Sequence, residues 1–237
     1  TRYETLFPYT TLFRSPGMNW EESKILTPLK RDFLKAFFER EQRFFLTGGA
    51  ALGVFYLQHR RSYDLDLFSA KEFDWLEVDG TIRDACRQIH AEVEVLKSAP
   101  LFRRYALKRA SDAEILDIVR DLNPQVDEAK THFGTIRVDT LHEILLNKIC
   151  TLVSRCEVKD LLDLYFLDRA GLRVEDYLNE ARRKDGGLDP AMMSHILANV
   201  KVAELSEYVV EPLALEDLQA YIERLRLKLA EIAFPKT

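Results

Sequence analysis

The chain has 237 residues, of which 47% are hydrophobic and 31% are charged, and its formal net charge at pH 7 is -5. This length and apolar content exclude a disulfide-stapled mini-protein and an intrinsically disordered chain. The negative net charge excludes a protein that coats nucleic acid through bulk positive charge. Any contact with a nucleotide or RNA must therefore come from a local basic patch.

The cysteines and the lack of long apolar runs favour an intracellular protein. Cys86, Cys150 and Cys156 form an odd set without a CxxC pair, which favours reduced thiols over a disulfide framework or a structural zinc site. No uncharged apolar run approaches the ~20 residues that a membrane helix needs. We therefore expect a cytoplasmic protein with no membrane partner.

Residues 1–17 (TRYETLFPYTTLFRSPG) precede the first methionine, Met18, and show neither helical nor alternating periodicity. Within them, residues 6–15 resemble the translation of a common sequencing-library adapter. We interpret residues 1–17 as a non-native segment joined to the gene during assembly, and the alternative is a genuine aromatic arm.

The stretch from residue 27 to 68 predicts alternating helices and strands. Thr27 and Pro28 form a helix start, because threonine caps helices and proline favours the first helical position. Polar and apolar side chains alternate over 63–68 (YDLDLF), as in a half-buried strand. The predicted order is helix, strand, glycine turn, helix and strand, over residues 28–40, 43–47, 48–49, 50–57 and 63–68.

The following residues predict one more helix and several strands before a helical C-terminal half. The helix is predicted over 81–90, and the strands over 93–96, 104–108, 114–120 and 134–138. In the strand over 114–120, Asp117 shares a face with Ile115 and Val119. Thr140 and Glu143 predict a capping box for helices from Leu141 onward, with breaks near Gly171, at residues 185–187 and at Pro212.

Residues 46–68 (LTGGAALGVFYLQHRRSYDLDLF) contain the pattern most informative about chemistry. A Gly48-Gly49 turn lets backbone approach a polyphosphate, and the next helix offers unpaired N–H groups. Asp64 and Asp66 are two apart on a strand, so both carboxylates project to one side and can share divalent cations. Asp117 is the best candidate for a third carboxylate that would complete a two-metal site. Each element alone is commonly an ordinary turn or a solvated face, whereas their order is the one that a nucleotide and metal site requires.

The segment GGAALGVFYLQHRRSYDLDLF resembles the signature of polymerase-β-like nucleotidyltransferases, in particular the AbiEii/AbiGii toxin family of bacterial abortive-infection and toxin-antitoxin systems. Residues 141–167 (LHEILLNKICTLVSRCEVKDLLDLYFL) resemble the family's downstream lysine motif and its arginine-to-aspartate motif. The resemblance implies that Gly48 and Gly49 form the nucleotide-binding turn. It also implies that Asp64 and Asp66 are the metal-binding pair and that Asp117 is the third acidic residue. Ala50 departs from the threonine frequent in the family, which removes a hydroxyl contact to phosphate.

The resemblance also implies a fold and an activity. We expect an α+β nucleotidyltransferase core with a mixed sheet over 18–139 and a helical C-terminal domain over 140–237. The implied activity is Mg²⁺- or Mn²⁺-dependent transfer of NMP from an NTP to an acceptor hydroxyl, with tRNA as acceptor and a separately encoded antitoxin as partner. The alternatives are an aminoglycoside-type nucleotidyltransferase and a catalytically silent nucleotide-binding module, and the clustered carboxylates argue against the silent module.

Basic residues follow the second motif. If the helix after Leu141 continues through Asp160, Lys148, Arg155 and Lys159 form one stripe at 100° per residue, suited to gripping a triphosphate or an RNA backbone. The alternative is that Lys159 pairs with Asp163 and that Arg155 points into water. Asp160 lies off this stripe, and we expect it to orient a basic side chain.

Two further groups of basic residues lie near the predicted strands. Arg60 and Arg61, in the loop before the Asp-x-Asp strand, are predicted to contact phosphate. His59 is a weaker candidate for a general base, since a metal lowers the hydroxyl pKa without it. The second group is either a solvated face or a resting place for a tRNA acceptor stem, and consists of Arg103, Arg104, Lys108 and Arg109.

Overall fold

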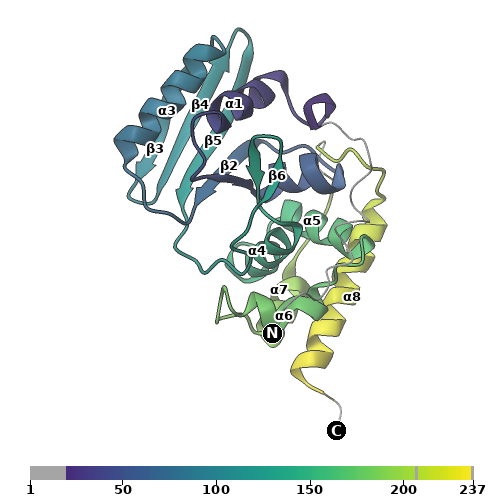
Figure 1. Ribbon diagram of the computed structural model, residues 1–237. Helices are drawn as coiled ribbons and strands as arrows, with labels where there is room; N and C mark the ends of the chain where they lie inside the picture. Colours follow the sequence, from purple (N-terminus) through teal and green to yellow (C-terminus); the bar gives the residue numbers. More distant parts are fainter. Residues whose placement is uncertain (1–19, 206–207, 236–237) are drawn as a thin grey trace.

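The computed structural model describes residues 20–205 and 208–235, and residues 1–17, which we interpreted as non-native, lie outside this part. Within the described residues, a seven-stranded mixed sheet has the order β3-β4-β5-β2-β1-β7-β6. A group of helices follows the sheet in sequence and lies beside it in space (Figure 1). The α+β class predicted from the sequence is confirmed.

The strands are long on the β3 side of the sheet and short on the β6 side. Their bounds are β1 (Phe45–Thr47), β2 (Asp64–Ser69), β3 (Glu92–Ala99), β4 (Phe102–Arg109), β5 (Asp112–Arg120), β6 (Thr131–Phe133) and β7 (Ile136–Val138). Strand β2 runs antiparallel to β1 and parallel to β5, and β4 is antiparallel to both β3 and β5.

Helices precede, interrupt and follow the strands. Their bounds are η2 (Trp20–Glu22), α1 (Pro28–Phe38), α2 (Gly48–Ala51), its π-helical continuation η3 (Leu52–Leu57), α3 (Trp75–Gln88), α4 (Leu141–Ser154), α5 (Val158–Arg169), α6 (Val174–Ala181), α7 (Pro190–Asn199) and α8 (Leu215–Ala233). None of the helices in the described part of the chain has both the length and the apolar character needed to cross a membrane.

The two faces of the sheet differ in chemistry. Leu65 and Leu67 of β2 are fully buried, while Asp64 and Asp66 alternate with them on the opposite face and are half-buried. Tyr105 on β4 pairs with Leu116, which pairs with Leu65, so Tyr105 lies on the leucine face. Its hydroxyl donates to the carboxylate of Asp79 on α3 at 2.6 Å, so the leucine face is the face that α3 covers. The alternation predicted for β2 therefore turns both aspartates away from the apolar layer.

Most predicted elements differ in their bounds from those in the structure, and two of these differences have a clear local cause. Helix α3 begins six residues before the predicted start, at Trp75, because the Asp74 side chain accepts hydrogen bonds from the backbone N–H groups of Leu76 and Glu77. The strand predicted over 134–138 is shorter, since Gly134 has φ of +65° and forms the turn between β6 and β7.

The predicted continuous helix through residues 141–160 is wrong. Helix α4 ends at Ser154 and α5 starts at Val158. Between them Cys156 adopts the left-handed conformation, with φ of +44°, and its N–H bonds to the carbonyl of Thr151 at 2.8 Å. The chain therefore turns at this point and α5 packs back against α4.

The break predicted at Pro212 is much longer than one turn. No helix is found between Asn199 and Leu215 in the described residues of that segment. The chain here runs beside the loop before β2, where Val209 forms an isolated antiparallel bridge with Arg60. The backbone hydrogen bonds of this segment thus go to a distant loop instead of to a helix.

The burial of β2 allows a direct test of the core. We expect Leu65→Ala to lower the free energy of unfolding by about 2–5 kcal/mol, because the side chain is 0% exposed and its removal leaves a cavity. Urea denaturation measures the change. The matched control is Leu76→Ala, whose side chain is 75% exposed, and equal losses in the two variants would contradict the assigned faces.

Candidate active site

Four polar side chains form one row across the face of the sheet opposite α3. Asp66 on β2 is directly opposite Asp117 on β5. Thr47 on β1 pairs with Asp66, and Arg104 on β4 pairs with Asp117. Because residues directly opposite each other in a sheet point to the same face, the register brings these side chains together.

Three carboxylates converge at the centre of this row. Oxygens of Asp64, Asp66 and Asp117 all lie within 4.8 Å of one another. Burial, together with the neighbouring charges of Asp64 and Asp117, raises the pKa of Asp66 to about 7. Carboxylate oxygens are hard donors that suit Mg²⁺ or Mn²⁺, so the donor set fits the divalent metal expected from the sequence.

The two glycines allow these charged groups to approach the start of α2. Gly48 has φ of +65°, and a Cβ at this position would overlap the carboxylate of Asp66. A Cβ at Gly49 would overlap the guanidinium of Arg60. The Gly48-Gly49 pair is therefore needed for the contacts of Asp66 and Arg60, as well as for the left-handed turn that starts α2. Ala50 is only 2% exposed, so its side chain faces the core.

A fully buried carboxylate, Asp163 on α5, binds three side chains at once. Its oxygens lie 2.6 Å from Nε and 2.8 Å from Nη2 of Arg60, 2.7 Å from Nε2 of His59 and 2.6 Å from Nζ of Lys148. Burial opposes ionisation, yet Lys148 and Arg60 outweigh it and hold the pKa of Asp163 well below its usual range. Burial lowers the pKa of His59, so its imidazole is neutral at pH 7.

Asp160, one turn earlier on α5, shares Lys148 with Asp163 and also binds Arg155. Its oxygens lie 2.8 Å from Nζ of Lys148, and 2.9 and 3.0 Å from Nε and Nη2 of Arg155. Burial opposes its ionisation, but Lys148 and Arg155 lower its pKa. We refer to Asp160, Asp163 and their basic partners Arg60, Lys148 and Arg155 as the buried ion-pair cluster.

The predicted stripe of Lys148, Arg155 and Lys159 is wrong, because α4 and α5 are separate helices. Lys148 points inward and Lys159 pairs with Glu157 at 2.9 Å. The alternative pairing of Lys159 with Asp163 is also wrong, since Asp163 is occupied by the partners described above. Arg155 does not simply point into water, as it is bonded to Asp160 while its side chain stays 46% exposed.

The two arginines before β2 have different environments. Arg60 is 5% exposed, its Nε and Nη2 bind Asp163 and its Nη1 donates to the carbonyl of Arg61 at 3.0 Å, so it lacks the free surface expected of a phosphate ligand. The side chain of Arg61 is exposed, and its backbone N–H donates to the carbonyl of Tyr208 at 2.8 Å. The loop of Arg60 thus joins the core to the C-terminal segment.

The basic residues of β4 do not form one patch. Arg103 points toward α3, where it pairs with Asp79 at 2.5 Å, while Arg104 points to the opposite face and binds both oxygens of Asp117, at 2.8 and 2.6 Å. Lys108 pairs with Glu94 and Arg109 pairs with Asp32. The sequence pattern did not identify Arg104 as a residue of the site. Its position opposite Asp117 follows once β4 and β5 are paired.

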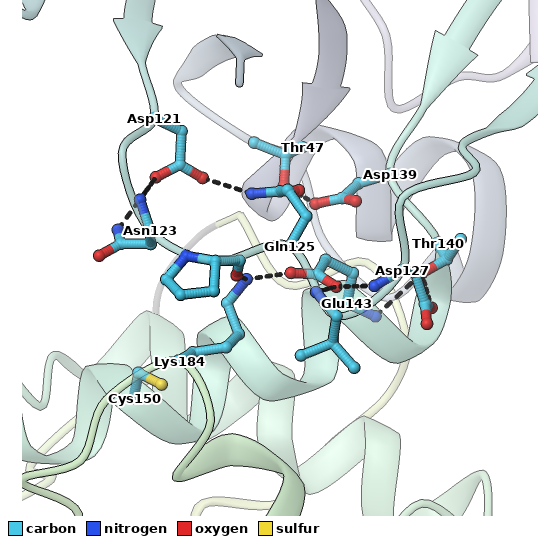
Figure 2. A network of polar contacts seen from close by, with 12 residues as sticks. Thr47, Asp121, Asn123, Gln125, Asp127, Asp139, Thr140, Glu143, Cys150 and Lys184 are labelled. Carbon is cyan, nitrogen blue, oxygen red and sulfur yellow. Dashed lines mark hydrogen bonds and ion pairs between the residues drawn. The ribbon is translucent and has the colours of Figure 1, made fainter. Parts of the chain in front are cut away.

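A second polar network supports the end of β1 (Figure 2). The Thr47 hydroxyl donates to Asp139 at 2.7 Å. Nζ of Lys130 lies 2.8 Å from the other oxygen of Asp139. The predicted capping box is half-formed: the N–H of Glu143 bonds to the hydroxyl of Thr140, but the Glu143 carboxylate binds Lys184 and the backbone of residues 126 and 127. Burial of Glu143 and Lys184 makes this pairing necessary.

Comparisons with known proteins give one family and two similar folds. The model of a family described as nucleotidyl transferase AbiEii toxin of type IV toxin-antitoxin systems matches residues 32–235. A solved structure from H. pylori, described as a candidate nucleotidyltransferase, has 20% identity and a TM-score of 0.54, with 86% of this chain and 94% of that chain covered. JHP933 from Helicobacter pylori has 22% identity and a TM-score of 0.55, with coverage of 86% and 90%. The comparison with curated proteins gives no match.

The pairing of Asp163 predicts a large loss of stability when its charge is removed. Asp163→Asn leaves Arg60 and Lys148 buried with too little compensating charge, and we expect it to lower the free energy of unfolding by about 3–5 kcal/mol. Asp168→Asn on the same helix is the control, because Asp168 binds the partly exposed Arg224 and surface pairs contribute about 1 kcal/mol or less. Urea denaturation of both variants measures the difference, and similar losses would contradict the role of Asp163.

The elevated pKa of Asp66 makes stability depend on pH. A carboxyl whose pKa rises on folding, here from 3.8 to about 7, favours folding below the unfolded value and loses that contribution as pH rises through the folded value. In EDTA at pH 8 we expect Asp66→Asn to be more stable than wild type by about 1–2 kcal/mol, or roughly 2–8 °C in Tm. At pH 5 the gain should be much smaller. Calorimetry at both pH values tests this, and a gain independent of pH would contradict it.

Proposed function

This chain belongs to the AbiEii family of nucleotidyltransferase toxins, and on that premise we propose that it transfers a nucleoside monophosphate from an NTP to a hydroxyl group of tRNA. The observation that carries the proposal is the convergence of Asp64, Asp66 and Asp117 next to the Gly48 turn. NTPs and tRNA are intracellular, so the reaction would take place in the cytoplasm.

In the proposed reaction, the oxygen of the acceptor hydroxyl attacks the α-phosphorus of the NTP, the bond from that phosphorus to the β-phosphate oxygen breaks, and pyrophosphate leaves. Asp64 and Asp66 would hold Mg²⁺ or Mn²⁺, and a divalent ion there would supply a positive charge that activates the hydroxyl and offsets the charge of the phosphates. Asp117 would complete the donor set and would help to activate the acceptor hydroxyl.

The groups around the start of α2 suit the triphosphate. The two glycines bring the Asp66 carboxylate and the guanidinium of Arg60 against the first turn of this helix. Because Arg60 and Lys148 are held in ion pairs, we propose that their charges contribute a fixed positive potential beneath the site. Arg155 is partly exposed, and its charge partly opposes the rise in the pKa of Asp66, which favours it as a direct phosphate contact.

Membership of a type IV toxin-antitoxin family implies a separately encoded antitoxin as partner. The choice of tRNA as acceptor rests on the resemblance of the sequence motifs to the toxin branch of the superfamily. A reaction with aminoglycosides uses the same core, so acceptor identity is the point at which the two enzyme activities differ.

Loss of one of the three clustered carboxylates should abolish the reaction. The assay uses purified tRNA and each of the four NTPs carrying a labelled α-phosphate. We expect wild type to label tRNA and Asp66→Ala to label it at least about 10³-fold less, because the metal loses a central ligand. The same substitution should remove toxicity on expression.

The matched control is Asp112→Ala, at the exposed start of the strand that carries Asp117, which should retain wild-type labelling. A fully active Asp66→Ala variant would refute the mechanism. Labelling of aminoglycosides in place of tRNA would identify the small-molecule activity, and NTP binding without turnover on any acceptor would favour a silent module.

A further inference from the structure

Arg104 holds its guanidinium against a carboxylate that the proposed function assigns to the metal. Nε and Nη2 of Arg104 lie 2.8 and 2.6 Å from the two oxygens of Asp117, and Nη2 also lies 4.0 Å from Oδ2 of Asp64. Since the oxygens of the three aspartates come within 4.8 Å of one another, the guanidinium lies at the edge of the space that they share.

The other contacts of Arg104 are weak. Its side chain is 42% exposed, and the ring of Phe102, on the same strand, lies 5.9 Å from its guanidinium carbon. By contrast, the Arg60 side chain is buried and binds a fully buried carboxylate. Arg103 pairs with Asp79, and its guanidinium carbon lies 4.5 Å from the ring of Trp75. Arg104 can therefore leave Asp117 by side-chain rotation without unpacking the core.

A divalent cation and this guanidinium compete for the same group. Both require oxygens of Asp117, and their like charges repel when they share one carboxylate. The planar guanidinium fits two oxygens of a phosphate as well as two oxygens of a carboxylate. A released Arg104 would thus find a suitable anion wherever the substrate places phosphates beside the metal.

We propose that Arg104 is an exchangeable counter-ion: it neutralises Asp117, is displaced when the metal binds, and then binds a phosphate of the polyanionic substrate. The inference rests on the proposed function, because it requires the three aspartates to be the metal site. If Arg104 only orients Asp117 for the metal, replacing Arg104 should weaken metal binding. If Arg104 competes with the metal for Asp117, replacing Arg104 should strengthen metal binding.

Titration of the full chain with Mn²⁺, following the EPR signal of the free ion without nucleotide, separates these two roles. We expect Arg104→Gln to bind Mn²⁺ about threefold to fivefold more tightly than wild type, since the metal no longer displaces a partly exposed ion pair. Arg103→Gln, which removes the neighbouring charge on the opposite face, should bind as wild type does. Equal or weaker binding by Arg104→Gln would overturn the exchange.

Kinetics at saturating Mn²⁺ test where the guanidinium goes. We expect Arg104→Gln to raise KM for the NTP or for tRNA about tenfold, and Arg104→Lys to restore part of the loss because it keeps the charge without the fork. An unchanged KM for both substrates would overturn the transfer to phosphate. Mn²⁺ binding that survives in Asp66→Asn would contradict the proposed function itself, whereas unchanged affinity in Arg104→Gln with intact dependence on Asp66 contradicts the exchange alone.

Discussion

The structure depends on one buried carboxylate. Asp163 is 0% exposed, and an ionised group at such a depth is stable only when it is fully paired. Its partners come from the loop before β2 and from α4, so the interaction joins the sheet to the C-terminal helices. It also fixes Arg60, whose guanidinium reaches Gly49, and Arg60 in turn fixes the path of the chain into Asp64 and Asp66. The position of the carboxylate pair on β2 thus follows from an ion pair formed some hundred residues away in sequence.

Aspartates with opposite electrostatic environments lie side by side in this molecule. Asp160 and Asp163 have basic partners that outweigh burial and lower their pKa values. Asp66 is flanked by Asp64 and Asp117 and has no direct basic partner among the described contacts, so its pKa rises to about 7. Uncompensated negative charge is the condition that favours a divalent cation, whereas compensated charge favours a rigid support. The same residue type therefore forms both the site and the frame that holds it.

The sequence predicted the elements whose pattern is local. Alternation over β2 identified the face of Asp64 and Asp66, and the pattern of β5 selected Asp117, which the register then places opposite Asp66. The turn between α4 and α5 was missed, since nothing in the sequence around Cys156 predicts a left-handed backbone conformation. The inward orientation of Arg60 and Lys148 was missed because their partner lies far away in sequence. Two acidic residues within the apolar run DLLDL of α5 were the available signal, since charges on a buried helix face require partners.

The central claim is that Asp64, Asp66 and Asp117 form a metal site beside the Gly48 turn. Crystals grown with Mn²⁺ and an NTP whose α–β bridging oxygen is replaced by a non-cleavable group test this directly by anomalous scattering. We expect an anomalous peak within about 2.0–2.6 Å of oxygens from Asp64 and Asp66, with the triphosphate at the start of α2. A nucleotide bound elsewhere, or a metal peak that avoids these carboxylates in crystals of active protein, would contradict it.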